Sequence, residues 1–209
     1  MIQVLFEDNH LLVLNKPFGL LTQPTEITLD SLENRGKAWL KEKYNKPFNV
    51  FLNPIHRLDR VAGGIVVFAK TSKALSRLGE SMRERAWKKT YRIRTDVLPK
   101  KSEGRLEHFL VHDDHKALVS LNGKQALLSY VVKPSGMIEV NLETGRYHQI
   151  RAQFAAIGCP IVGDIKYGAR EDGRERILLQ HYSCAFPHPI SKEEVYIELP
   201  HGLVHKLLT

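Results

Sequence analysis

The residues best able to do chemistry lie in the segment His56-Arg57-Leu58-Asp59-Arg60. Asp59 stands between two arginines, whose charges favour its ionised form, so it could act as a nucleophile or as a base. The pair Gly63-Gly64 and an apolar run follow directly, and backbone without side chains lets a ligand approach closely. The alternative is that Asp59 is only an ion-pair partner in a tight loop, and the local sequence leaves both interpretations open.

A second polar cluster is Thr144-Gly145-Arg146-Tyr147-His148-Gln149-Ile150-Arg151. On a helix, Tyr147 and Arg151 share one face, and His148 lies beside them. Arginines at the start of a helix are unfavourable next to the helix dipole unless an anion compensates. We therefore expect an acid or a phosphate close to this segment.

A third cluster is Lys88-Lys89-Thr90-Tyr91-Arg92-Ile93-Arg94. If it is a strand, Lys89, Tyr91 and Ile93 share one face, because successive side chains point to opposite sides. The alternative is an amphipathic edge strand whose tyrosine is simply buried.

The chain carries an excess of positive charge. Its 31 lysines and arginines against 23 aspartates and glutamates give a formal net charge of +8 with neutral histidines. Positive residues gather between Arg77 and Arg94, where only Glu80 and Glu84 oppose them. A basic face of this kind suits a nucleic-acid backbone, although charge alone is equally compatible with a solvated helix face.

The composition is that of a globular protein. Of 209 residues, 43% are hydrophobic and 26% charged, which excludes disordered, collagen-like and low-complexity chains. No apolar run reaches the ~18–20 residues of a membrane span, and the N-terminus lacks the basic start and cleavage site of a signal peptide. The two cysteines are too few for a disulfide framework. We therefore expect one cytoplasmic domain over residues 1–209.

Short apolar runs and helical spacing predict an α+β fold around a mixed, mainly antiparallel sheet with flanking helices. A doubly wound nucleotide-binding fold is disfavoured, because its glycine-rich motifs are absent. Helices are expected over Leu29–Tyr44, Ser72–Arg85 and Tyr147–Ile157. Strands are expected over Val4–Phe6, Leu11–Leu14, Ile65–Ala69, Tyr91–Thr95, Lys116–Leu121, Ala126–Val132 and Ile138–Leu142. Surface loops are expected over Lys16–Thr28, Pro99–Gly104 and Tyr167–Arg176.

The three clusters together resemble the motifs of the RluA-type pseudouridine synthases, enzymes that isomerise selected uridines in RNA. The first cluster is similar to the family's HRLD motif, Lys89-Thr90-Tyr91 to its K-x-Y motif, and Gly145–Arg151 to its GRxHQ(L/I)R motif. The resemblance extends over nearly the whole chain. Further matching segments are Glu7-Asp8, Asn15-Lys16-Pro17-Phe18-Gly19, Gly158, Pro160, Gly163-Asp164, Tyr167-Gly168 and Phe186-Pro187-His188-Pro189.

The resemblance implies the pseudouridine synthase fold in its short form, with transfer or ribosomal RNA as the partner. It implies that Asp59 acts on the ribose, that Arg151 pairs with Asp59, and that Tyr91 stacks on the uracil. The residues that it implies for substrate binding are His56, Arg57, Arg60, Lys89, Arg146, His148, Gln149 and Ile150. The reaction needs no cofactor, no metal ion and no membrane, and a monomer is the default expectation.

The chain departs from the family pattern at three places. Ala62-Gly63-Gly64 stands where many members have Thr-Ser-Gly, which removes two hydroxyl groups near Asp59. A histidine common before the closing motif is Gln180 here and is displaced to His181. The small N-terminal RNA-binding domain of many members is expected to be absent, because the family's opening pattern starts at residue 1.

Two other classes of function compete with this interpretation. The first is a non-catalytic RNA-binding protein that keeps the synthase fold, which loss of the acid would support, yet Asp59, Tyr91 and Arg151 are all present.

The second is a metal-dependent hydrolase. His108, His112 and His115 are close in sequence, and His201 and His205 have the i, i+4 spacing of helical metal ligands. Without a glutamate base in an HExxH frame, we interpret these histidines as surface or RNA-facing residues.

Overall fold

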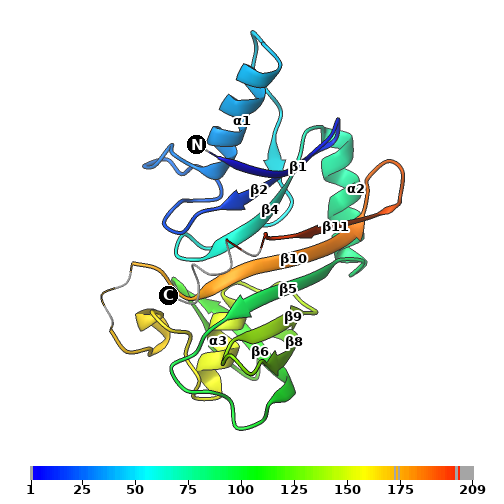
Figure 1. Cartoon of the computed structure of the whole chain (residues 1–209). Coiled ribbons are helices and arrows are strands. Elements are labelled where there is room, and N and C mark those ends of the chain that lie inside the picture. Colours follow the sequence, from blue (N-terminus) through cyan, green and yellow to red (C-terminus); the bar gives the residue numbers. More distant parts are fainter. Residues whose placement is uncertain (1, 172, 174, 201, 203–209) are drawn as a thin grey trace. The chain divides into compact units, whose positions relative to one another are not determined.

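The computed structural model describes residues 2–171, 173, 175–200 and 202 (Figure 1). Their internal contacts divide them into two compact units, which are described separately here. Within the described ranges, unit 1 contains residues 2–87, 181–200 and 202, and unit 2 contains residues 88–171, 173 and 175–180.

Unit 1 is built on a sheet in which β1, β2, β4 and β10 are consecutive neighbours. The pairs β1–β2, β2–β4, β3–β4 and β10–β11 are antiparallel. The strands are β1 (Gln3–Glu7), β2 (Leu11–Lys16), β3 (Asn53–Pro54), β4 (Gly63–Ala69), β10 (Leu179–Pro187, of which residues 181–187 belong to this unit) and β11 (Glu194–Glu198).

The helices of unit 1 are α1 (Leu32–Lys43) and α2 (Ser72–Arg83). Each begins after a hydroxyl N-cap, because the side chains of Ser31 and Thr71 accept hydrogen bonds from backbone N–H groups of the first turn. Burial of their apolar stripes, with Leu32, Leu40 and Leu78 fully buried, attaches both helices to the unit.

Strand β4 is the centre of unit 1, because every one of its residues is buried. Its neighbour β10 comes so close that a Cβ built on Gly64 would lie 2.3 Å from the carbonyl oxygen of His181. The stacked rings of Trp87 and Phe186, 4.2 Å apart, extend the same core.

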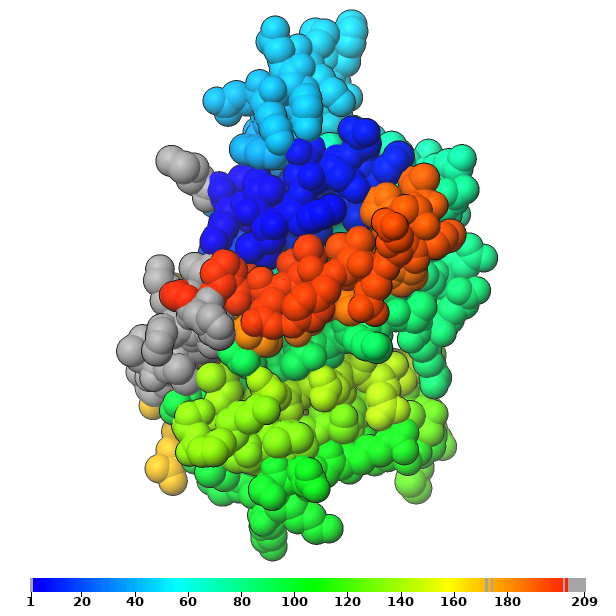
Figure 2. All heavy atoms as spheres, turned by 45° about the vertical axis from the view of Figure 1, so that its right-hand side comes forward, coloured from blue at the N-terminus to red at the C-terminus, as the bar shows by residue number. Residues whose placement is uncertain are grey.

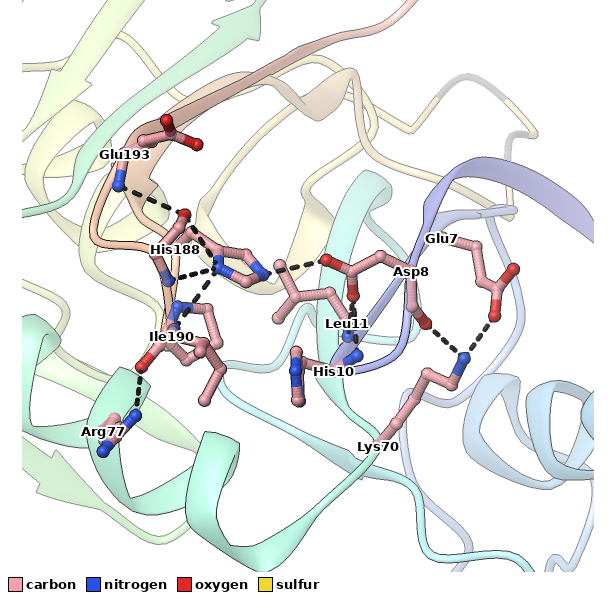
Figure 3. Close-up of polar contacts among 11 residues, drawn as sticks. Glu7, Asp8, His10, Leu11, Lys70, Arg77, His188, Ile190 and Glu193 are labelled. Atoms are coloured by element: carbon pink, nitrogen blue, oxygen red, sulfur yellow. Dashed lines mark hydrogen bonds and ion pairs between the residues drawn. The ribbon is translucent and has the colours of Figure 1, made fainter.

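Segments from the early and late parts of the described chain lie side by side in unit 1, where the blue N-terminal residues lie against the orange and red hairpin of β10 and β11 (Figure 2). One oxygen of the Asp8 carboxylate accepts the backbone N–H groups of His10 and Leu11, and the other lies 2.8 Å from Nε2 of His188 (Figure 3). Lys70, just after β4, donates to the Glu7 carboxylate and to the Asp8 carbonyl. The opening and closing motifs of the sequence therefore support each other.

Unit 2 is an antiparallel sheet in the order β5-β9-β8-β6-β7. Helix α3 (Gln149–Ala156) packs against β6 and β7 and buries Ile150 and Phe154. A short 3-10 helix, η1 (Ile165–Tyr167), follows it. The strands are β5 (Lys88–Ile93), β6 (Glu103–Asp113), β7 (Lys116–Val119), β8 (Lys124–Val132) and β9 (Ile138–Leu142).

The expected helices and strands are present, with shifted ends. The strand expected over residues 91–95 is β5 at Lys88–Ile93. Helix α1 begins at Leu32, and not at Leu29 as expected, because Ser31 is its cap, and Leu29 is 71% exposed. Strands β3, β6, β10 and β11 were not predicted, and β6 starts inside the segment expected to be the Pro99–Gly104 loop.

The close approach of Gly64 to β10 predicts a large stability loss for Gly64→Ala. The residue has a φ of +113°, which is unfavourable for alanine, and the added Cβ would collide with backbone. We expect the free energy of unfolding to fall by more than about 3 kcal/mol in urea titrations. Gly136→Ala is the matched control, because Gly136 has a φ of +75° with nothing within 4 Å of the added Cβ, and it should cost about 1 kcal/mol. Equal losses in the two variants would contradict the prediction.

Candidate active site residues

The loop that carries Asp59 is held on both sides by the segment after β2. The Thr22 hydroxyl donates to the Leu58 carbonyl at 2.9 Å and accepts the Leu58 N–H at 3.1 Å. The Gly19 N–H donates to the Arg60 carbonyl at 2.8 Å, and Arg60 Nε donates back to the Gly19 carbonyl at 3.1 Å. These bonds fix the backbone before and after Asp59, whose own side chain is half-buried.

A buried lysine lies beneath this loop. Lys16, the last residue of β2, is 1% exposed, and its Nζ donates to the carbonyls of Leu20 at 2.7 Å, Pro17 at 3.0 Å and Arg60 at 3.3 Å. An ammonium group has three N–H donors, so these three acceptors satisfy it. Burial lowers the pKa of Lys16 from 10.5 to about 8, and the negative charge of Asp59 opposes part of that lowering.

The neighbours of Asp59 differ in exposure. Arg57 and Arg60 are exposed, so their guanidinium groups are accessible to a polyanion. His56 is half-buried, accepts a backbone N–H of β4 through Nε2 at 3.3 Å, and packs edge-to-face against the rings of His181 and Trp87. His56 is thus anchored to the core of unit 1, and its contact with substrate stays a prediction.

An aromatic ring lies against Gly63, where the sequence departs from the family pattern. A Cβ built on Gly63 would lie 2.9 Å from Cζ of Phe18. Phe18 therefore occupies the space that a side chain at position 63 would need. The region next to the Asp59 loop is therefore apolar at a position where many family members carry a hydroxyl group.

In unit 2, strand β5 places Lys89 and Tyr91 on one face, as predicted from their alternation. Tyr91 is 8% exposed. Nζ of Lys89 lies 3.7 Å from the position that a Cβ on Gly145 would occupy, at the start of the segment Gly145–Arg151. On the opposite face Arg92 forms an ion pair with its cross-strand partner Glu139 at 2.8 Å. The backbone pairing of β5 with β9 over four residue pairs holds the register that keeps Tyr91 on its face.

The turn before α3 is held by the amide of Gln149, which is 3% exposed. Its Oε1 accepts from the Thr144 hydroxyl at 2.8 Å and from the Arg146 N–H at 2.9 Å, and its Nε2 donates to the Leu127 carbonyl at 3.0 Å. These contacts give Gln149 a role within the turn. Substrate contacts of Gln149, Arg146 and the buried Ile150 stay predictions.

Arg151 meets the acid that its position at a helix start led us to expect. Its Nε and Nη2 donate to the two oxygens of Asp164, each at 2.7 Å, and the two side chains are 6% and 1% exposed. Nη1 lies 2.9 Å from Nε2 of His148, and the guanidinium carbon lies 4.9 Å from the centre of the Tyr167 ring.

The start of α3 differs from the sequence expectation. His148 is the N-cap residue, with a left-handed φ of 48°, and the helix begins at Gln149. Tyr147 therefore precedes the helix and does not share a helical face with Arg151. Instead the Tyr147 ring stacks on the ring of His148 at 3.9 Å, and His148 links it to Arg151.

The candidate residues are distributed over both units. Asp59, with His56, Arg57 and Arg60, belongs to unit 1, whereas Tyr91, Arg151 and the other predicted residues belong to unit 2. The pairing of Arg151 with Asp59 and the stacking role of Tyr91 stay predictions. Sequence reasoning assigned no role to three residues that the contacts single out, although each lies in a segment similar to a family motif: Lys16, Asp164 and Tyr167.

No metal site is found in the described part of the chain, where no three histidine, cysteine, aspartate or glutamate residues are grouped to hold an ion. His108 instead contacts the Gln153 amide at 3.1 Å, and His112 packs on the ring of Tyr147. His201 and His205 lie outside the described residues. None of the helices in the described ranges has the length and apolarity to cross a membrane.

Comparison with protein families and curated proteins gives consistent matches. The family model of RNA pseudouridylate synthase matches residues 10–156. The dual-specificity RNA pseudouridine synthase RluA of Pasteurella multocida is 32% identical, covering 95% of this chain and 93% of that protein. The RNA pseudouridine synthase YhcT of Bacillus subtilis is 31% identical over 95% of this chain and 68% of its own length. Ribosomal large subunit pseudouridine synthase C of Buchnera aphidicola is 30% identical over 97% of this chain and 68% of its own length.

Solved structures show the same fold. Human RNA pseudouridylate synthase domain containing 4 superposes with a TM-score of 0.80 at 24% identity, covering 98% of this chain and 91% of that one. Human RNA pseudouridylate synthase domain containing 1 gives a TM-score of 0.78 at 21% identity, covering 99% and 86%. The predicted α+β class with mainly antiparallel strands and flanking helices is confirmed.

The buried Lys16 predicts how stability changes with pH. Its pKa is about 8 in the folded chain and near 10.5 when exposed, so between these values the unfolded chain binds more protons and stability rises with pH. Relative to Lys16→Met, the wild type should gain about 3 kcal/mol of unfolding free energy across this range. Urea titrations at several pH values measure the difference. Lys116→Met, which removes an exposed lysine, serves as the control and should show no such trend, and a flat difference for Lys16→Met would contradict the assignment.

Proposed function

Because the chain belongs to the RNA pseudouridylate synthase family, we propose that it isomerises selected uridines of transfer or ribosomal RNA and that Asp59 performs the step on the ribose. The family reaction is an isomerisation of uridine to pseudouridine. The bond between ribose C1′ and uracil N1 breaks, the base turns, and C1′ bonds to C5. The C5 proton is lost and N1 gains one, so no external donor or acceptor is consumed.

The observation that supports this role most directly is the way in which Asp59 is held. Bonds from Thr22 and Gly19 fix the backbone on either side of it, and the buried ammonium group of Lys16 donates to the carbonyl of the next residue, Arg60. A carboxylate on a rigid backbone can act without first reorganising its surroundings.

Asp59 can act by two routes. It can attack C1′ as a carboxylate nucleophile, as in retaining glycosidases, or it can remove a proton from the neighbouring ribose carbon. Both routes need the ionised carboxylate, and both predict the same loss in a variant that cannot ionise.

Tyr91 and Arg151 complete the proposed machinery. The mostly buried ring of Tyr91 offers a flat face on which a uracil can stack. Arg151 is proposed to pair with Asp59, as the family resemblance implies, because a planar guanidinium suits a carboxylate better than the ammonium group of a lysine.

The RNA must deliver its uridine out of the base stack. Flipping costs a few kcal/mol, least in loops and at weak pairs, and contacts to phosphates offset this cost. The cations around the end of α2 and the start of β5 are exposed and suited to such contacts: Arg83, Arg85 and Lys88.

The catalytic assignment predicts that Asp59→Asn loses at least about 10⁴-fold in turnover, because the amide keeps the shape but cannot act as a charged nucleophile or base. Release of tritium from RNA labelled at C5 of uridine measures turnover, with total RNA from cells that lack the protein as substrate. Asp30→Asn, which removes an exposed acid paired with Arg35, is the matched control and should leave turnover unchanged. Activity of Asp59→Asn within tenfold of the wild type would end the assignment.

The basic residues predict a change in the salt dependence of RNA binding. Replacing Arg83, Arg85 and Lys88 with glutamine should weaken binding, and each lost phosphate contact should reduce the slope of log affinity against log salt by about 0.9 or less. The modified uridine should not change, because phosphate contacts position an RNA without specifying its sequence. Fluorescence-anisotropy titrations at several salt concentrations provide the slope. An unchanged slope would leave these residues without a role in RNA binding.

A further inference from the structure

The side chain of Arg151 is held by a carboxylate that lies outside its own motif. Asp164 takes the Nε and Nη2 hydrogens of Arg151 in a two-point ion pair with both distances at 2.7 Å. Because a guanidinium is planar, two parallel bonds along one edge fix the rotation of the whole group. The side chain of Asp164 is 1% exposed, so water does not loosen the pair.

A second contact fixes Arg151 from another direction. Nη1 can only donate, so Nε2 of His148, 2.9 Å away, must accept and carry no proton. The proton of a neutral His148 therefore lies on Nδ1, which is 3.0 Å from the Tyr167 hydroxyl. That hydroxyl also accepts the Ala117 N–H at 2.7 Å, so the imidazole is tied to β7.

The ring of Tyr167 covers one face of the guanidinium, with 4.9 Å between the guanidinium carbon and the ring centre. Of the five N–H groups of Arg151, Asp164 takes two and His148 one. Asp164 thus fixes the orientation of the guanidinium plane by taking its Nε and Nη2 hydrogens.

We infer that Asp164 is the positioning residue of Arg151 in the proposed uridine isomerisation. The carboxylate of Asp164 already balances the charge of the guanidinium. Arg151 therefore contributes directed hydrogen bonds, more than net positive charge, to its proposed partner Asp59. This inference rests on the proposed function, because it assigns Asp164 a role in the rate of that reaction.

Two substitutions of Asp164 and one double variant separate position from charge. Asp164→Asn keeps the shape and removes the charge, and we expect kcat to fall at least 100-fold with KM within threefold of the wild type. Asp164→Glu keeps the ion pair but lengthens the side chain by one methylene, which displaces the guanidinium. We expect it to retain the wild-type melting temperature within a few degrees and to lose at least tenfold in kcat. The third, Asp164→Asn combined with Arg151→Met, tests whether Asp164 acts through Arg151.

In that double variant, adding Asp164→Asn should change kcat by no more than twofold relative to Arg151→Met alone, and should raise the melting temperature by removing a buried unpaired carboxylate. If Asp164 had a purely structural role, kcat of the double variant would be lower than kcat of Arg151→Met by the same factor of 100. If Asp164→Asn alone does not fold, the double variant and Asp164→Glu still test the inference.

The matched control is Glu139→Gln. It removes a carboxylate from Arg92, another ion pair of unit 2, on the face of β5 opposite Tyr91. We expect it to leave kcat unchanged. Asp164 variants with kcat within threefold of the wild type while folded would overturn the inference, as would a multiplicative loss in the double variant.

A measurement without substrate distinguishes failure of this inference from failure of the proposed function. In a proton–nitrogen NMR spectrum of the arginine Nε–H groups, the Arg151 signal should be resolved and slow to exchange, because Asp164 accepts it in a buried site. It should vanish in Asp164→Asn, while the Arg92 signal persists. Loss of the signal with a wild type that is inactive on RNA would refute the function alone, whereas a protected signal in Asp164→Asn would refute the positioning of Arg151 by Asp164.

Discussion

The burial of a lysine ammonium group is the constraint on which the candidate chemistry of unit 1 depends. An ion removed from water costs several kcal/mol unless polar groups replace its hydration. Nζ of Lys16 recovers that loss from three backbone carbonyls, two from the turn after β2 and one from Arg60. The path of the Asp59 loop is therefore determined by the need to solvate a charge, and that charge in turn acts on Asp59.

In unit 2, buried polar groups are hydrogen-bonded mainly by side chains. The guanidinium of Arg151, the amide of Gln149 and the imidazole of His148 all form hydrogen bonds within the unit. The segment Gly145–Arg151 is therefore held by polar contacts of its buried side chains. In both units, the residues that support the motifs come from distant parts of the sequence, as with Thr22 for Leu58. Rigid support of this kind reduces the reorganisation needed during a reaction.

The sequence predicted the elements whose apolar pattern matches their burial, such as β4, where every residue is buried. It did not predict β6, whose residues are largely exposed or half-buried and whose stability comes from pairing with β7 and β8. It also did not predict β10, because polar residues such as Gln180 and His181 interrupt the apolar run of a strand buried from Leu179 to Phe186. The roles of Lys16 and Asp164 could not be predicted either, since they depend on which carbonyls and which arginine the folded chain brings to them.

The interrupted sequence of unit 1 has a consequence for synthesis on the ribosome. Residues 2–87 are synthesised before residues 88–180, and β10, which borders β4, is completed only after both. At common elongation speeds the edge of β4 waits roughly 5–20 s for its neighbour, while the strands of unit 2 pair mostly with nearby strands and can form early. An uncovered strand edge is a site of mispairing with other chains. The length of unit 2, and not the final stability of the protein, therefore determines how long the nascent chain is open to aggregation.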